Sequence, residues 1–472
     1  MQEKNSQAVL QNKKIPYLNA KFDRRMSFKS RLLLIALWAI IPAAFIGPGT
    51  VTASLQAGAA FEFKLLWVYV FATIAAFVLQ EASVRVTIFS GKSLGEAISS
   101  QFEAKSSRGF VLYMIAIVII LGSAAFEAGN IIGAKEGLSM VFHIDPKILV
   151  LIICGLSFLA LSMPTFAMIA KFMGFMVIFM GLAFMTTAIM LKPDYTAIAK
   201  GCVVPFFPST ISGSILLLGL IGTTVVPYNL FFGSLGKDQT VSEMRFGLSI
   251  AVIIGGLISI SIVIVGTLIK GDFNYDSTFA RLLQEKVSPW AVNAFGIGLF
   301  AASFASSITA PLASAITAQS LFRSRNQKKW DKKSFLFRAI WGGVILVGLI
   351  FGMIDSEPVT AIILAQALNA LILPLICIFL LFVVNDPRVM TRKGINTWFA
   401  NVLTGIILWV LLILGLANIL NSIEEIVKIK LLDNNLIFAA IIAVSLLITA
   451  WTVYRIYILR MNVFLEKPEK QI

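Results

Sequence analysis

The stretch AFIGPGTVTASLQAGAAF (residues 44–61) interrupts a segment that is otherwise apolar enough to be a membrane-spanning helix. Two glycines and a proline stand together at Gly47, Pro48 and Gly49, and Thr50 follows them. In the hydrocarbon region of a bilayer, non-helical backbone is tolerated only where protein encloses it or where it lines a watery cavity. The motif therefore predicts a spanning helix that is broken at mid-depth to form part of a binding site.

The composition of the whole chain agrees with a membrane location. Of its 472 residues, 58% are hydrophobic and only 13% are charged, whereas soluble proteins carry about 25% charged residues. Apolar runs long enough to cross a bilayer recur along the chain, which predicts an all-α integral membrane protein with about twelve transmembrane helices. The predicted spans lie near 32–62, 65–89, 110–141, 148–163, 166–191, 210–235, 247–269, 290–321, 339–354, 358–384, 398–420 and 435–458.

The distribution of basic residues predicts the orientation. The net charge is +15, and with the amino terminus inside, most Lys and Arg residues fall on the cytoplasmic side, many of them in RSRNQKKWDKKSFLFR (323–338). This bias is the one that orients membrane proteins, so we expect both termini in the cytoplasm of a cell with the chain in its plasma (inner) membrane. The basic excess then reports topology and contact with the lipid bilayer rather than nucleic-acid binding.

Several classes of protein are disfavoured by what the sequence lacks. It contains no nucleotide-binding P-loop and no long polar segment that could fold as a soluble catalytic domain, so we expect neither an enzyme nor a pump. Its three cysteines, Cys154, Cys202 and Cys377, are far apart, which predicts neither a disulfide framework nor a metal cluster. We expect no cofactor.

A second interrupted span lies five helices after the first. The sixth span, SGSILLLGLIGTTVVPYNLFFGSLGK, breaks near residues 222–229. An odd number of spans per unit turns the second unit upside down, and paired broken helices are the best sequence indication of an inverted-repeat transporter with a central site. The predicted organisation is a cytoplasmic tail, two five-helix repeats, two additional helices and a second tail, at 1–31, 32–191, 210–384, 398–458 and 459–472.

These motifs resemble those of the Nramp family of divalent-metal transporters. LQAGAAFEFKLLWVYVFATIAAFVLQ and SGKSLGEAI resemble the first-to-second helix region, VPYNLFFGS the sixth helix, FASSITAPLASAITAQSLF the eighth, and LAQALNALILPLICIFLLF the tenth. The resemblance covers about residues 30–390. It implies a LeuT-type fold, a 5+5 inverted repeat with helices 1 and 6 broken.

The chain departs from the family where the family binds its metal. The first-helix motif Asp-Pro-Gly-Asn is matched by the residues 47–50, so the carboxylate is replaced by Gly47 and the amide by Thr50. The sixth-helix Met is matched by Val226, the His after Pro227 by Tyr228, and the later His by Gly233. We therefore expect no transition-metal site in this chain.

Without the acid, the same scaffold favours a small anion. Each half-helix that begins after a break presents unpaired N–H groups and the positive end of its dipole, which together attract an oxyanion. No Arg or Lys lies at either break, which argues against phosphate or sulfate held by a guanidinium. Bicarbonate is our first choice. The expected substrate-binding residues are Gly47, Pro48, Gly49, Thr50, Thr223, Val226, Pro227, Tyr228, Asn229 and Gln366, the last because it matches a tenth-helix glutamine near the ion in the family.

Charged residues inside the spans are the other candidates for function. Glu127 and Asn130 match the third-helix acidic pair that the family links to proton movement, so we expect them to couple transport to H⁺ or Na⁺. Glu81 and Arg85 are four residues apart and lie on one helix face, which favours a structural ion pair.

Two alternatives stay open at this stage. A divalent cation of the Mg²⁺ or Mn²⁺ kind could pass as a largely hydrated ion with weak selectivity, and the chain could be a membrane sensor that transports nothing. The loss of charged ligands disfavours the first, because carboxylates normally supply most of the affinity for a divalent ion. The lack of a cytoplasmic domain disfavours the second. We expect a monomer.

Overall fold

The computed structural model describes residues 28–102, 105–163, 165–208, 210–269, 277–323, 328–354, 358–391, 394–427 and 435–465. Within those ranges the regular structure is helical throughout. The helices are α2 (Phe28–Trp38), α3 (Ile40–Phe45), α4 (Pro48–Phe61), α5 (Leu66–Ser90), α6 (Leu94–Ser99), α7 (Lys105–Ser139), α8 (Pro146–Leu161), α9 (Phe166–Met190), α10 (Tyr195–Val203), α11 (Ile211–Thr224), the 3-10 helix η1 (Pro227–Gly236), α12 (Val241–Gly266), α13 (Ser277–Lys286), α14 (Pro289–Phe322), α15 (Phe335–Met353), α16 (Pro358–Asn385), α17 (Trp398–Val427) and α18 (Asn435–Leu465).

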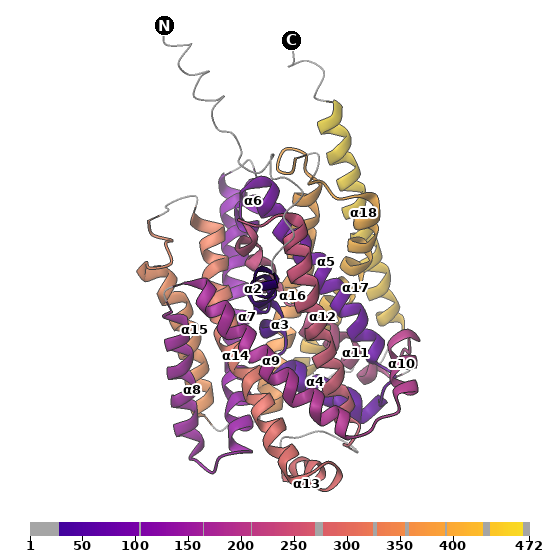
Figure 1. The fold of residues 1–472 in the computed structure, drawn as a ribbon. Coiled ribbons are helices and arrows are strands. Elements are labelled where there is room, and N and C mark those ends of the chain that lie inside the picture. Colours follow the sequence, from indigo (N-terminus) through magenta and orange to yellow (C-terminus); the bar gives the residue numbers. More distant parts are fainter. Residues whose placement is uncertain are drawn as a thin grey trace.

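The long helices form one bundle, with the short helix α6 at one end and α13 at the other, while α2 and α3 lie near the middle (Figure 1). Ten segments of the described chain are long and apolar enough to cross a membrane, and two shorter apolar helices, Pro146–Leu161 and Ile372–Asn385, accompany them. The prediction of an all-α membrane protein is confirmed. The helices α6, α10 and α13 lie in segments that we had treated as connections.

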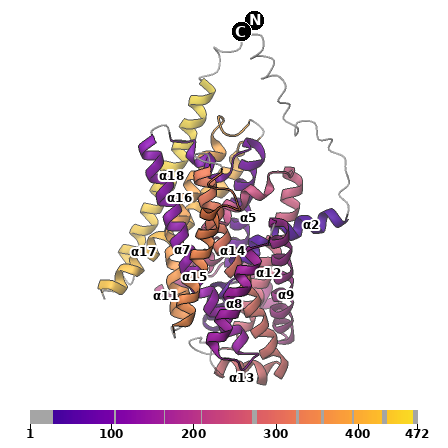
Figure 2. The same ribbon diagram turned by 90° about the vertical axis from the view of Figure 1, so that its left-hand side faces the viewer.

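The amino-terminal part of the first span does not run along the bundle. Helix α2 is seen end-on in Figure 1 and from the side in Figure 2, so it lies at a large angle to the long helices. It packs on α12 and α9, while Phe28 is 77% exposed at its start. The chain enters the core only near Trp38, which is fully buried.

Two helix crossings close to the centre depend on glycine. A Cβ atom on Gly58 of α4 would lie 2.8 Å from the Gly266 backbone of α12, and one on Gly137 of α7 would lie 2.5 Å from the Phe300 nitrogen of α14. Small residues let helices in a membrane approach until their backbones touch, which strengthens van der Waals packing. The first crossing holds α12 against α4, the second half of the broken span, and the second holds α14 against α7.

Candidate functional site

The first break is two residues long. Helix α3 ends at Phe45, Ile46 and Gly47 are non-helical, and α4 begins at Pro48. The break expected at the motif 47–50 is present, but of those four residues only Gly47 is non-helical, and Ile46 before it belongs to the break. Proline has its φ fixed near the helical value and lacks an N–H that would go unpaired in the first turn, so Pro48 starts the helix at once.

The second break is equally short. Helix α11 ends at Thr224, Val225 and Val226 are extended, and η1 begins at Pro227. The sequence placed this break near residues 222–229, and the structure narrows it to Val225 and Val226, because Thr224 is still helical and Pro227 already begins the 3-10 helix. The paired breaks themselves are confirmed.

Both half-helices that follow the breaks begin without a side-chain cap. Neither Gly47 before α4 nor Val226 before η1 caps its helix with a side-chain hydrogen bond, and each helix has its proline at the first position. Residues Gly47, Pro48, Gly49 and Thr50 are buried, as are residues 226–229. Two buried helix amino termini therefore present N–H groups and positive dipole ends inside the bundle.

The threonine hydroxyls at the breaks donate to backbone carbonyls in this structure. Thr50 donates to the Phe45 carbonyl across the first break, and Thr52 donates to Pro48 at 2.8 Å. Thr223 and Thr224 both donate to the Leu220 carbonyl, at 3.1 and 3.0 Å. The hydrogens of these hydroxyls are already used, so the donors at the site come from the backbone.

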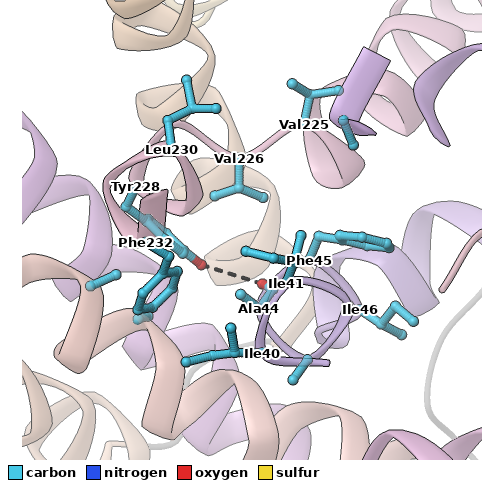
Figure 3. Packing of buried hydrophobic residues seen from close by; sticks show 14 of the residues in the cluster. Ile40, Ile41, Ala44, Phe45, Ile46, Val225, Val226, Tyr228, Leu230 and Phe232 are labelled. Carbon is cyan, nitrogen blue, oxygen red and sulfur yellow. Dashed lines mark hydrogen bonds between the residues drawn. The ribbon is translucent and has the colours of Figure 1, made fainter. Parts of the chain in front are cut away.

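Tyr228 joins the two breaks. Its ring is fully buried, and its hydroxyl donates to the Ala44 carbonyl of α3 at 3.4 Å (Figure 3). The Phe126 ring of α7 meets it edge-on with the ring centres 6.2 Å apart. Figure 3 shows Val226 in the same layer, pointing toward the end of α3. Tyr228 therefore connects η1, to which it belongs, with α3 and α7.

Asn229 contributes an unpaired oxygen to this region. Its side chain is 4% exposed, and its Oδ1 atom has no hydrogen-bond partner among the described residues. A buried polar atom without a partner costs about 1–3 kcal/mol, which a bound ligand could recover.

Glu127 and Asn130 lie together on α7 and are fully buried. The Asn130 amide donates to Glu127 Oε2 at 3.3 Å. Glu127 Oε1 and Asn130 Oδ1 have no hydrogen-bond partner among the described residues, and no ion pair there involves Glu127. The pair leaves two buried oxygen atoms that a proton or a small cation could satisfy.

The structure adds serines of α14 that the sequence analysis did not single out. The Ser306 hydroxyl lies 3.1 Å from the Ala43 carbonyl and 3.4 Å from the Ile46 carbonyl, at the end of α3. A Cβ atom on Gly47 would lie 2.8 Å from Ser306 Oγ and 3.4 Å from Asn130 Oδ1. The first break is therefore the place where α7 and α14 meet α3, and the small hydroxyl residues of FASSITAPLASAITAQS were the available signal.

At Gly233, the position that the resemblance matched to the later sixth-helix histidine, the packing leaves little room for a side chain. A Cβ atom there would lie 3.0 Å from the Ser83 backbone of α5. The Ser83 hydroxyl also donates to the Leu230 carbonyl. Helix η1 is therefore pressed directly against α5.

Glu81 and Arg85 form an ion pair at 3.2 Å within a larger network, away from the breaks. Arg245 of α12 binds the other Glu81 oxygen at 2.7 Å. Arg85 also donates to the Gly394 carbonyl at 2.6 Å and to the Asn396 side chain, so the pair ties α5 to the segment between α16 and α17.

Two further points concern metal binding. Among the described residues, no three His, Cys, Asp or Glu side chains gather in a way that could hold a metal ion. Gln366 lies in α16, but its side chain is outside the described residues, so its predicted place at the site stays a prediction.

Comparison with known proteins gives the chain its family. The model of the Nramp family (natural resistance-associated macrophage protein-like) matches residues 38–421. The fold is similar to that of the Eremococcus coleocola manganese transporter, crystallised with an aromatic bis-isothiourea compound, with TM-score 0.74, 19% identity and coverage of 93% of this chain and 97% of that one.

A more distant structure supports the fold class. Mhp1, a nucleobase-cation-symport-1 family transporter in a closed conformation with bromovinylhydantoin bound, matches with TM-score 0.53 and 15% identity over 90% of this chain and 92% of that one. At these identities the structural likeness shows the fold, while the family match covers most of the chain. The chain belongs to the Nramp family and is a membrane transporter of the LeuT-type fold.

Proposed function

We propose that this Nramp-family protein is a secondary transporter of a small anion, with bicarbonate as the favoured substrate. The observation that carries the proposal is the pair of buried, uncapped helix amino termini at α4 and η1. At these breaks Gly47 and Val226 stand where the family has its aspartate and methionine ligands. Backbone N–H groups and positive dipole ends are donors for an oxyanion and repel a cation.

Bicarbonate fits this donor set because of its size and its single proton. Its oxygens can accept from first-turn N–H groups, and its hydroxyl can donate to an unpaired acceptor such as Asn229 Oδ1. An ion with one charge also needs no guanidinium for its binding, in contrast to phosphate or sulfate.

The coupling ion is proposed to act at Glu127 and Asn130. Two of their oxygen atoms are buried and have no partner among the described residues, and an uncompensated buried charge is costly. Protonation of Glu127, or a Na⁺ ion bound by both side chains, would remove that cost. Movement of H⁺ or Na⁺ down its gradient would then drive uptake of the anion.

A divalent cation is the second candidate substrate. It is favoured by the carboxylate of Glu127 and by the manganese transporter of similar fold.

The decisive experiment reconstitutes the purified protein into liposomes and measures uptake of radiolabelled bicarbonate and of Mn²⁺ side by side. We expect bicarbonate flux and no saturable Mn²⁺ uptake, and saturable Mn²⁺ uptake without bicarbonate flux would replace the anion by the cation.

The coupling role has its own test. Glu127→Gln keeps the size of the side chain and removes its charge, so the variant should still exchange bicarbonate but should not concentrate it under an imposed H⁺ or Na⁺ gradient. Concentration to the wild-type level would show that Glu127 does not couple transport.

We also propose that the protein acts as a monomer in the plasma membrane. Both termini are proposed to lie in the cytoplasm, because the predicted cytoplasmic segments carry most of the positive charge.

A further inference from the structure

Gln80 of α5 is a buried side chain whose amide makes no hydrogen bond to the described residues. Its side chain is 1% exposed. Neither Oε1 nor Nε2 has a hydrogen-bond partner among the described residues. A buried amide with both ends unsatisfied is expensive, so the position calls for a partner that the described residues do not supply.

The position of Gln80 along α5 can be read from its neighbours on the same face. Eleven residues earlier, Tyr69 meets Ser54 of α4 at 2.5 Å and also contacts Thr223 of α11. Three residues later, Ser83 donates to the Leu230 carbonyl of η1. Eleven residues of α-helix return to the same face within about 20°.

This face of α5 therefore contacts the chain both before and after the second break. Thr223 lies just before Val225 and Val226, and Leu230 lies just after them. Gln80 stands about 4.5 Å along the axis from Ser83 on the side of Tyr69. Helical side chains lean toward the amino terminus of their helix, so the long side chain of Gln80 extends from the level of Leu230 toward the break.

A second unpaired amide lies in that first turn of η1. Asn229 Oδ1 is also buried and without a partner among the described residues. The uncapped amino terminus of η1 adds its N–H groups to the same region. The two side-chain amides and the helix end thus belong to α5 and η1, two helices that pack against each other.

We propose that Gln80 is a substrate-contacting residue of the transport site, with Nε2 donating to the transported ion and Oε1 accepting its proton. The identity of the ion rests on the proposed function. The contact itself does not, because an amide can also ligate a cation through Oε1. Nothing in the first-helix or sixth-helix motifs indicated this residue.

The test compares Gln80→Leu with Gln80→Glu in the full-length protein, and uses Thr87→Val as the matched control. Thr87 lies two turns further along the same face, is 3% exposed, and has an unpaired hydroxyl among the described residues. The measurements are the thermal midpoint without substrate and the KM for sodium bicarbonate and for manganese chloride in liposomes.

The proposal expects Gln80→Leu to keep or raise the thermal midpoint, since it removes polar atoms that have no partner. It expects the same variant to raise the KM of whichever ion the wild type carries by about tenfold or more, equivalent to about 1.4 kcal/mol. Thr87→Val should leave the KM within twofold of wild type.

Measuring both ions separates the proposed contact of Gln80 with the substrate from the proposed identity of that substrate. If the wild type carries Mn²⁺ and Gln80→Leu impairs that uptake, the anion fails while the contact stands. Gln80→Glu should abolish bicarbonate uptake in the anion case and retain Mn²⁺ uptake in the cation case. A lower thermal midpoint for Gln80→Leu would mean that the amide is paired within the protein, and an unchanged KM would mean that it does not touch substrate; either result overturns the proposal.

Discussion

Gly47 shows why the residue at a break has to be judged from its backbone. A glycine at a break can be needed for its backbone conformation or for its lack of a side chain. The structure has φ −113° and ψ −173° at Gly47, which is extended backbone that any L-residue adopts. The nearest obstacle to a side chain is the Ser306 hydroxyl, and a serine side chain can rotate away. Charge and size at this position can therefore be tested separately.

Gly47→Asp restores the acid of the family and should abolish bicarbonate uptake, whereas Gly47→Asn should retain a measurable part of it. A carboxylate about 4 Å from the ion repels it by about 4 kcal/mol at an effective dielectric constant near 20. That energy corresponds to a loss of affinity of several hundredfold. The measurement is the KM for bicarbonate in liposomes. Equal behaviour of the two variants would show that charge does not govern the site.

Helix η1 is positioned by its close contact with α5. Gly233 faces the Ser83 backbone at a distance that no Cβ atom can accept without movement. A larger side chain at position 233 would therefore require η1 and α5 to move apart.

Gly233→Ala should lower the thermal midpoint of the protein, because its Cβ atom would lie 2.5 Å from Ser83 Oγ and 3.0 Å from the Ser83 backbone. The overpacking cost is about 1–3 kcal/mol. Gly219→Ala in α11 is the control, since a Cβ atom there meets nothing within 4 Å. Matching midpoints for the two variants would contradict the close contact of η1 with α5.

At the scale of the whole molecule, a polar network joins the bundle to its last two helices. Arg85 reaches Gly394 and Asn396 beyond α16. Asn396 binds Asn401 of α17 at 2.9 Å, and Arg460 of α18 donates to the Asn396 carbonyl at 2.6 Å. These bonds hold α17 and α18 on the repeats that carry the breaks.

Arg85→Ala should destabilise the protein strongly. Removing one member of a buried ion pair costs about 3–5 kcal/mol, and we expect the lower end because Arg245 still neutralises Glu81. Arg281→Ala is the control, since Arg281 pairs with Glu285 at 3.9 Å on the surface, where a pair contributes at most about 1 kcal/mol. Thermal unfolding in detergent measures both, and equal midpoints would refute a structural role for Arg85.

Cys202 on α10 tests the orientation. The predicted topology places α10 outside the cell, and Cys202 is half-buried while Cys154 and Cys377 are buried. A membrane-impermeant maleimide should label intact cells at one site, which Cys202→Ser removes. Burial raises the pKa of the Cys202 thiol, so the thiolate fraction is small at neutral pH and labelling should accelerate as the pH rises. Labelling only after the cells are opened would reverse the orientation.

The sequence by itself determined the membrane class, the spans and the places of the two breaks. Each of these depends on local chemistry: apolar runs must be long enough for the bilayer, and Gly47, Pro48 and Pro227 constrain the backbone wherever they occur. The widths of the breaks were overestimated, because glycine and threonine after a proline are compatible with either a helix or a loop.

Only the tertiary structure decided which side chains surround the breaks. Ser306 and Gln80 lie on helices other than the two that break, and although small hydroxyl residues mark the segment of Ser306, neither segment says which of its side chains meets the breaks. Their roles arise because α14 and α5 turn those particular faces toward the breaks. The direction of the threonine hydroxyls was decided in the same way, by the carbonyls that each helix end leaves within reach, and helix packing rather than local sequence sets that geometry.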